Sequence, residues 1–116
     1  MSSMFTELSS PKSCRLIDLV DAEIRTAAVL NSQFLVVYGN KPYLNMKVEL
    51  VPQVYIEQPE YWEIEVIGCL HGVGLPADTP YNASLSLSGL QGRKGIEIVG
   101  AITSKKIEFT DEALVM

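Results

Sequence analysis

The stretch that decides the fold is YWEIEVIGCLHGVGLPADTPYNASLSLSGL, which runs from Tyr61 to Leu90. At both ends of this stretch, apolar and polar residues alternate at every second position. Such a period of two is typical of β-strands that bury one face. The pattern predicts two strands separated by a loop. Their inward-facing residues are expected to be Trp62, Ile64, Val66, Gly68 and Leu70 in the first and Tyr81, Ala83, Leu85, Leu87 and Gly89 in the second.

The same kind of pattern continues on both sides of this stretch. Residues 33–39 (QFLVVYG) read as a buried strand, and the sequence from Gly39 to Pro42 supplies turn residues. Residues 43–50 (YLNMKVEL) then alternate, which predicts a hairpin with Leu44, Met46, Val48 and Leu50 on its inner face.

The remaining segments add further short strands. Residues 96–102 and 105–109 read as the last two, whereas the prolines of residues 52–59 indicate an edge strand or a loop. Residues 14–30 fit either two short strands or one helix, and the surrounding strands favour the first. Seven or eight strands follow one another at intervals of about 8–14 residues. We therefore expect an all-β fold, either a small antiparallel β-sandwich or a closed barrel.

The length and composition predict one domain. The chain has 116 residues, of which 47% are hydrophobic. This is enough for a core without additional cross-links. We expect a single β domain over residues 13–110, a flexible tail over residues 1–12 and a short tail over residues 111–116.

The charge and cysteine content limit the partners and the compartment. A net charge of −5 opposes binding to nucleic acid or to an anionic membrane surface. Cys14 and Cys69 have neither the density of a disulfide scaffold nor a metal-binding spacing. With no apolar run of about 20 residues and no signal-like start, the sequence predicts a reduced cytoplasmic protein. We expect no metal ion and no cofactor.

The segment between the two strands, residues 71–80, reads as a ten-residue loop that carries the only histidine. Long loops without regular structure are often functional. His71 and Asp78 could serve as a base and its orienting carboxylate. Cys69 is a weaker candidate, because residues two apart on a strand lie about 6.5–7 Å from each other, beyond hydrogen-bond reach. The simpler interpretation places Cys69 in the core and His71 at a strand end.

Two further groups could bind a ligand. Trp62 and Tyr81, near His71, could line an apolar pocket, or they could be core residues. Arg93 and Lys94 lie among glycines in GLQGRKG, where backbone N–H groups could bind an anion. A strand and not a helix follows this loop, so a basic turn that contacts an acidic partner is the better interpretation. Lys105 and Lys106 are expected near it.

The least usual pattern is a row of small uncharged side chains. Ser84, Ser86 and Ser88 follow Asn82 on one face of the second strand. If this strand lies at a sheet edge, the lack of charges favours pairing with a second subunit. The alternative is a polar outer face without a partner.

These observations favour a binding protein over an enzyme. The leading hypothesis is a non-enzymatic β domain that acts through self-association and through binding of a protein partner or a small ligand. The alternative is a small hydrolase that uses Asp78 and His71.

Overall fold

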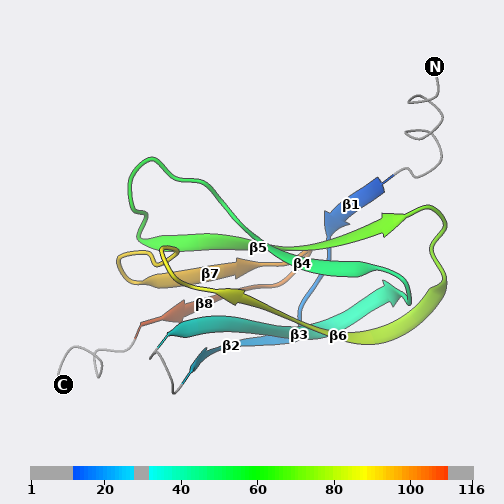
Figure 1. Ribbon diagram of the computed structural model, residues 1–116, viewed down its shortest axis with the longest axis horizontal. Coiled ribbons are helices and arrows are strands. Elements are labelled where there is room, and N and C mark those ends of the chain that lie inside the picture. The colour runs from blue at the N-terminus through cyan, green and yellow to red at the C-terminus, as the bar shows by residue number, and fades with distance from the viewer. Residues whose placement is uncertain (1–11, 28–31, 110–116) are drawn as a thin grey trace.

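The computed structural model describes residues 12–27 and 32–109. This part of the chain forms eight β-strands and no helix, arranged in two layers (Figure 1). The strands are β1 (Lys12–Leu16), β2 (Asp21–Thr26), β3 (Gln33–Tyr43), β4 (Lys47–Pro52), β5 (Tyr61–His71), β6 (Pro76–Ser86), β7 (Gly95–Val99) and β8 (Ser104–Glu108). The all-β prediction is confirmed, including two strands rather than a helix within residues 14–30.

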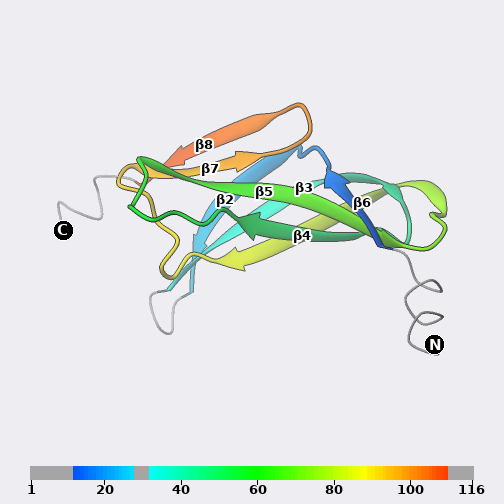
Figure 2. The same ribbon diagram turned by 90° about the horizontal axis from the view of Figure 1, so that it is seen from above.

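The first sheet contains five strands and is organised around β5 (Figure 2). β4 pairs with one edge of β5, and the other edge is divided between two strands. The first half of β5 pairs in parallel with β7, and the second half pairs antiparallel with β1. β8 then pairs with β7. The expectation of a wholly antiparallel fold is therefore wrong, because β6 lies in the other sheet and allows the chain to return parallel to β5.

The second sheet has three strands in the order β2–β3–β6, and the two sheets are not joined into a barrel. The core lies between them and takes side chains from both. The alternation predicted for β5 is confirmed, since Ile64 and Val66 have no exposed surface. In β6 the predicted inward residues Tyr81, Ala83 and Leu85 are half-buried between exposed neighbours, whereas Gly89, also predicted to face inward, is exposed in the turn after the strand. The buried cluster consists of Ile17, Leu19, Ala22, Leu35, Val37, Met46, Leu50, Ile64, Val66, Leu87, Ile96 and Ile98.

The predicted hairpin of residues 33–50 is wrong in two respects. β3 continues through Gly39 to Tyr43, and the turn lies at residues 44–46. β3 and β4 also belong to different sheets. A glycine is needed at this position of the strand because the ring of Tyr81 lies over it. An added Cβ on Gly39 would meet ring atoms at 2.7 Å. A register shift between Lys41 and Tyr43 accommodates Pro42, which has no N–H.

A short crossover segment, residues 17–20, carries the chain from the first sheet to the second. Ile17 and Leu19 are buried, and the Asp18 carboxylate is bound by the β7–β8 turn. The N–H groups of Thr103 (2.8 Å) and Ile102 (3.1 Å) and the Thr103 hydroxyl (3.0 Å) all donate to it. The hydroxyl of Tyr81 donates to the Asp18 carbonyl at 2.8 Å. The crossover is therefore fixed by both layers.

These bonds give the crossover segment a dependence on pH. The Thr103 N–H, helped by the other donors and opposed by partial burial, holds the pKa of Asp18 below its ordinary value of 3.8. Because the folded-state pKa is below the unfolded one, the stabilisation is complete above about pH 5 and disappears as the pH falls through the folded value. We expect Asp18→Asn to lower the free energy of unfolding by about 1 kcal/mol at neutral pH, a figure reduced for solvent screening.

Urea unfolding of both proteins at several pH values tests this expectation. The difference in free energy between the wild type and Asp18→Asn should narrow as the pH falls from about 6 to about 3. A difference that is constant across this range would show that the charge on Asp18 has no part in holding the turn.

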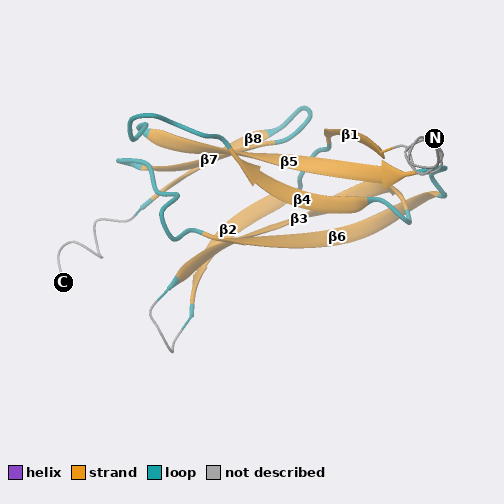
Figure 3. Ribbon diagram, turned by 45° about the horizontal axis from the view of Figure 1, so that its top comes forward, coloured by secondary structure: helices purple, strands orange, loops and turns teal. Residues whose placement is uncertain are grey.

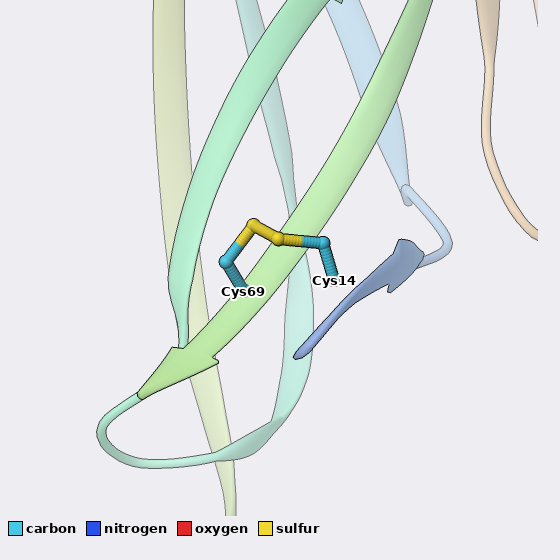
Figure 4. Close-up of a disulfide and its surroundings, with 2 residues drawn as sticks. All are labelled: Cys14 and Cys69. Carbon is cyan, nitrogen blue, oxygen red and sulfur yellow. A yellow bond between two sulfur atoms is a disulfide. The ribbon is translucent and has the colours of Figure 1, made fainter. Parts of the chain in front are cut away.

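The two cysteines form a disulfide that joins neighbouring strands of the first sheet. Cys14 on β1 lies directly opposite Cys69 on β5, and their sulfur atoms are bonded (Figure 4). The expectation of two reduced thiols is therefore wrong. The 55-residue separation conceals the pair in the sequence, because only the pairing of β1 with β5 brings the two residues together.

Candidate functional site

A large surface hollow lies between the edges of the two sheets, where β2 faces β8; we call it the β2–β8 cleft. Its volume is about 1070 Å³. The end of the second sheet formed by β2 and β3 diverges here from β7 and β8 (Figure 3). The cleft is lined by Ala22, Glu23, Ile24, Thr26, Gln33, Gln91, Gly92, Arg93, Lys94, Lys105, Lys106, Ile107, Glu108 and Phe109.

The side chain of Lys105 bridges the two sheets at the cleft, and that of Gln91 joins the β6–β7 loop to the second sheet. The Lys105 ammonium binds the Asp21 carboxylate and donates to the Ala22 carbonyl at 3.0 Å. The hydrogen bond from Lys105 lowers the pKa of Asp21. The Gln91 amide donates to the Gln33 side chain at 3.3 Å. The hollow is therefore a site of defined shape.

The apolar part of the cleft comes from alternate positions of its two bordering strands. Ile24 on β2, Ile107 on β8 and Phe109 just after it are half-buried and pack against the core. They leave apolar surface facing the hollow, where a ligand could cover it.

The basic turn lies at this cleft, together with the lysines that follow it. Arg93 and Lys94 share the lining with Lys105 and Lys106, so the expected proximity is confirmed. Arg93 donates to the Gln58 carbonyl at 2.7 Å, Lys94 pairs with Glu60 at 3.2 Å, and Lys106 lies 4.7 Å from the centre of the Tyr61 ring.

The backbone of this turn is not arranged to cradle an anion. The N–H of Arg93 donates to the Pro59 carbonyl (2.9 Å), and the N–H of Lys94 donates to the Glu60 carbonyl (2.8 Å). Gly92 and Gly95 are required for another reason: an added Cβ on either would meet backbone atoms within 2.6 Å. The glycines allow close packing of the chain, and any attraction for anions comes from the side chains.

A second candidate surface is the free edge of β6. The Leu87 N–H donates to the Gln33 carbonyl at 3.0 Å, so the odd-numbered residues of this antiparallel ladder bond to β3. The backbone groups of Asn82, Ser84 and Ser86 consequently face away from the sheet; we call these three residues the β6 edge. Their side chains are exposed, as is that of Ser88.

The β6 edge differs from the other sheet edges in its lack of charge. Every other edge strand carries at least two charged side chains, which discourage pairing with another chain: Lys12 and Arg15 on β1, Asp21, Glu23 and Arg25 on β2, Lys47 and Glu49 on β4, and Lys105, Lys106 and Glu108 on β8. β6 has only Asp78, near its start. Pro76 and Pro80 also lie before residue 82, so the open part of the edge begins there.

The proposed catalytic residues do not form a constellation. The loop between β5 and β6 is residues 72–75 and not 71–80, because Pro76 already begins β6. His71 ends β5 opposite Lys12, and Asp78 lies within β6. In the described part of the chain, no hydrogen bond joins them. Cys69 is in the disulfide and has no free thiol.

The short loop is fastened to the neighbouring turn by Asn45. Its amide donates to the Val73 carbonyl (3.0 Å), and its oxygen accepts the Leu75 N–H (2.9 Å). The two turns are therefore held as one rigid tip beside His71.

The two aromatic residues predicted to line a pocket lie apart. Trp62 is near the start of β5, about 30 Å along the strand from His71 at its end. Its indole N–H donates to the Gln53 carbonyl at 3.0 Å, and its ring packs edge-on against Tyr55. Tyr81 is in the other sheet, where burial raises its pKa to about 12. Neither residue lines the β2–β8 cleft, but Tyr81 lines a second hollow of about 490 Å³ between β3 and β6.

Sequence reasoning missed most of the residues that form the cleft. Ile24, Ile107 and Phe109 read as ordinary strand residues, and their position became apparent only from the pairing of the strands.

Within residues 12–27 and 32–109, no group of three histidine, cysteine or carboxylate side chains could hold a metal ion. The same residues contain no helix long and apolar enough to cross a membrane.

Comparisons with known proteins add no assignment to this geometry. The chain matches no family model, no curated protein and no solved structure.

Proposed function

We propose that this protein is a two-layer β-sandwich that acts through self-association, with the β6 edge as the contact between copies. The observation that carries the proposal is the absence of charge on this edge, in contrast to every other edge of the described sheets. Unpaired backbone groups on an unprotected edge are a template for another strand.

The geometry favours one particular pairing. Two copies of β6 that meet antiparallel about a two-fold axis at Ser84 would place Ser84 opposite its equivalent, and Asn82 opposite Ser86. All three residues direct backbone groups outward, so each opposed pair would exchange two hydrogen bonds. The second sheets of the two copies would then form one continuous sheet of six strands.

Ser84 is the residue to change. We expect Ser84→Lys to weaken dimerisation by at least about tenfold, because two ammonium groups would face each other across the axis. Ser84→Thr is the matched control, since it is uncharged and suited to a strand. Sedimentation and light scattering over micromolar concentrations measure both. A monomeric wild type at tens of micromolar would refute the proposal.

A cysteine at the same position tests the pairing itself. Directly opposed hydrogen-bonded residues have Cα atoms about 5.5 Å apart, within the range of a disulfide. Ser84→Cys should therefore form a covalent dimer under mild oxidation, whereas Ser104→Cys, exposed on β8, should not. Equal cross-linking of both variants would exclude the β6 contact.

The disulfide also bears on the compartment. The sequence alone favoured the cytoplasm, a location that the disulfide argues against. Because disulfides persist mainly in oxidising surroundings, we infer that the protein works outside the reducing cytosol.

The alternative of a hydrolase also stays a prediction. It depends on His71 and Asp78, for which the structure offers no hydrogen-bonded partnership. A general hydrolase screen of the wild type and Asp78→Ala tests it, and activity lost only in the variant would favour the enzyme.

A further inference from the structure

The β2–β8 cleft has the features of a site for an extended peptide, which is a function separate from self-association. The first feature is the unpaired backbone of β8. The Phe109 N–H donates to the Lys94 carbonyl at 2.9 Å, so the odd-numbered residues of β8 bond to β7. The backbone groups of Ser104, Lys106 and Glu108 consequently face the cleft, and none of the described strands pairs with them.

The facing edge of β2 is partly occupied. The Ala27 N–H donates to the Ser32 carbonyl at 2.7 Å, so the even-numbered residues of β2 face outward. Of these, Ala22 already gives its carbonyl to Lys105. An incoming strand therefore finds its longer run of free groups on β8.

The second feature is the alternation of side chains on β8. Lys105 and Ile107 point inward, and Ser104, Lys106 and Glu108 point outward. A strand added to β8 would alternate in the same way. Its inward side chains would cover the half-buried Ile107 and Phe109, with Ile24 across the cleft. One of its outward side chains would lie opposite Lys106.

The third feature is charge. The protein as a whole is acidic, with a net charge of −5. The cleft is lined instead by four cations, Arg93, Lys94, Lys105 and Lys106, against the carboxylates of Glu23 and Glu108. Lys106 makes no ion pair within the described residues and lies against the Tyr61 ring. It is therefore available to a carboxylate.

We propose that the β2–β8 cleft binds an extended segment of a partner protein, which adds as a strand to β8, places alternate apolar side chains over Ile107 and Phe109, and presents a carboxylate opposite Lys106. Strand addition of this kind draws affinity from main-chain hydrogen bonds and specificity from the alternating side chains.

The probe is a capped seven-residue peptide of sequence Val-Thr-Val-Glu-Val-Thr-Val with a fluorescent label, titrated by anisotropy. Its control carries lysine in place of the glutamate. We expect the glutamate peptide to bind the wild type roughly tenfold more tightly, and Lys106→Glu to reverse this preference. Equal binding of both peptides, or no binding of either, would overturn the proposal.

A second pair of variants tests the backbone contact. Lys106→Pro removes the outward N–H, which bonds to none of the eight described strands, and Lys106→Ala removes only the charge. The peptide should bind Lys106→Pro several-fold more weakly than Lys106→Ala, with both variants folded by circular dichroism. Similar affinities would exclude pairing along β8.

Two additional measurements separate this site from its alternatives. Peptide binding should be unchanged in Ser84→Lys; its loss there would show that the peptide pairs with the β6 edge instead. Dodecanoate provides the comparison with a small amphipathic anion. If dodecanoate binds and the glutamate peptide does not, the cleft belongs to a small ligand and the proposal is wrong.

Discussion

Replacement of both cysteines by alanine is expected to lower the free energy of unfolding by about 4 kcal/mol, the largest loss we predict. The Cys14–Cys69 bond closes a loop with a sequence separation of 55 residues. A cross-link of that span removes a large part of the conformational freedom of the unfolded chain, which accounts for the magnitude. For a domain of this size the loss corresponds to a melting temperature lower by roughly 15 °C.

Reduction provides the control for this prediction. The wild type in excess reductant should melt close to the double variant, and the double variant should not respond to reductant. Thermal melts followed by circular dichroism, with a count of free thiols in the denatured protein, measure both. Two reactive thiols in the untreated protein would contradict the disulfide and the inference about its compartment.

Substitution of Gly95 by alanine is expected to cost about 3 kcal/mol, the second largest effect. Gly95 begins β7 and lies opposite Glu108 on β8. An added Cβ would meet the Ile107 carbonyl oxygen at 2.1 Å. The obstructing atoms belong to the backbone and not to a flexible side chain, so the two strands must separate before the methyl group can fit. Urea unfolding gives the change in free energy.

Gly89 is the matched control from the preceding turn. It has a positive φ of 77°, but an added Cβ there meets no atom within 4 Å. Gly89→Ala should therefore cost only the conformational strain, about 1 kcal/mol. If the two variants were equally stable, close packing of the backbone at Gly95 would not be the reason for its glycine.

The sequence predicted the parts of the fold that depend on local alternation. Residue patterns within one short segment predict three of these parts. They are the inward faces of β5 and β6, the exposed serine row, and the proline-containing loop after β4. The serine row could be recognised as unusual because its lack of charge is visible in the sequence. The prediction that this row pairs with a second subunit required its strand to lie at a sheet edge, and β6 is an edge strand of the second sheet.

What could not be predicted depends on partners distant in the sequence. Three features arise from the order of the strands in the sheets, which the alternation of apolar and polar residues does not reveal. They are the parallel pairing of β5 with β7, the opposition of Cys14 and Cys69, and the cleft between β2 and β8. Gly39 and Pro42 were read as turn residues because they are common in turns. The space needed by the Tyr81 ring and a local register shift place them in a strand instead.

The crossover segment also bears on how the protein is made. The Ile17 carbonyl accepts a hydrogen bond from the Ala101 N–H, and the central strand β5 lacks one neighbour until β7 has been added. During synthesis on a ribosome, the residues before β7 would therefore emerge without the contacts that complete the crossover and the larger sheet. Contacts this distant in the chain slow folding and leave strand edges uncovered in the meantime. Strand edges of the nascent chain should thus stay uncovered until β7 and β8 have emerged.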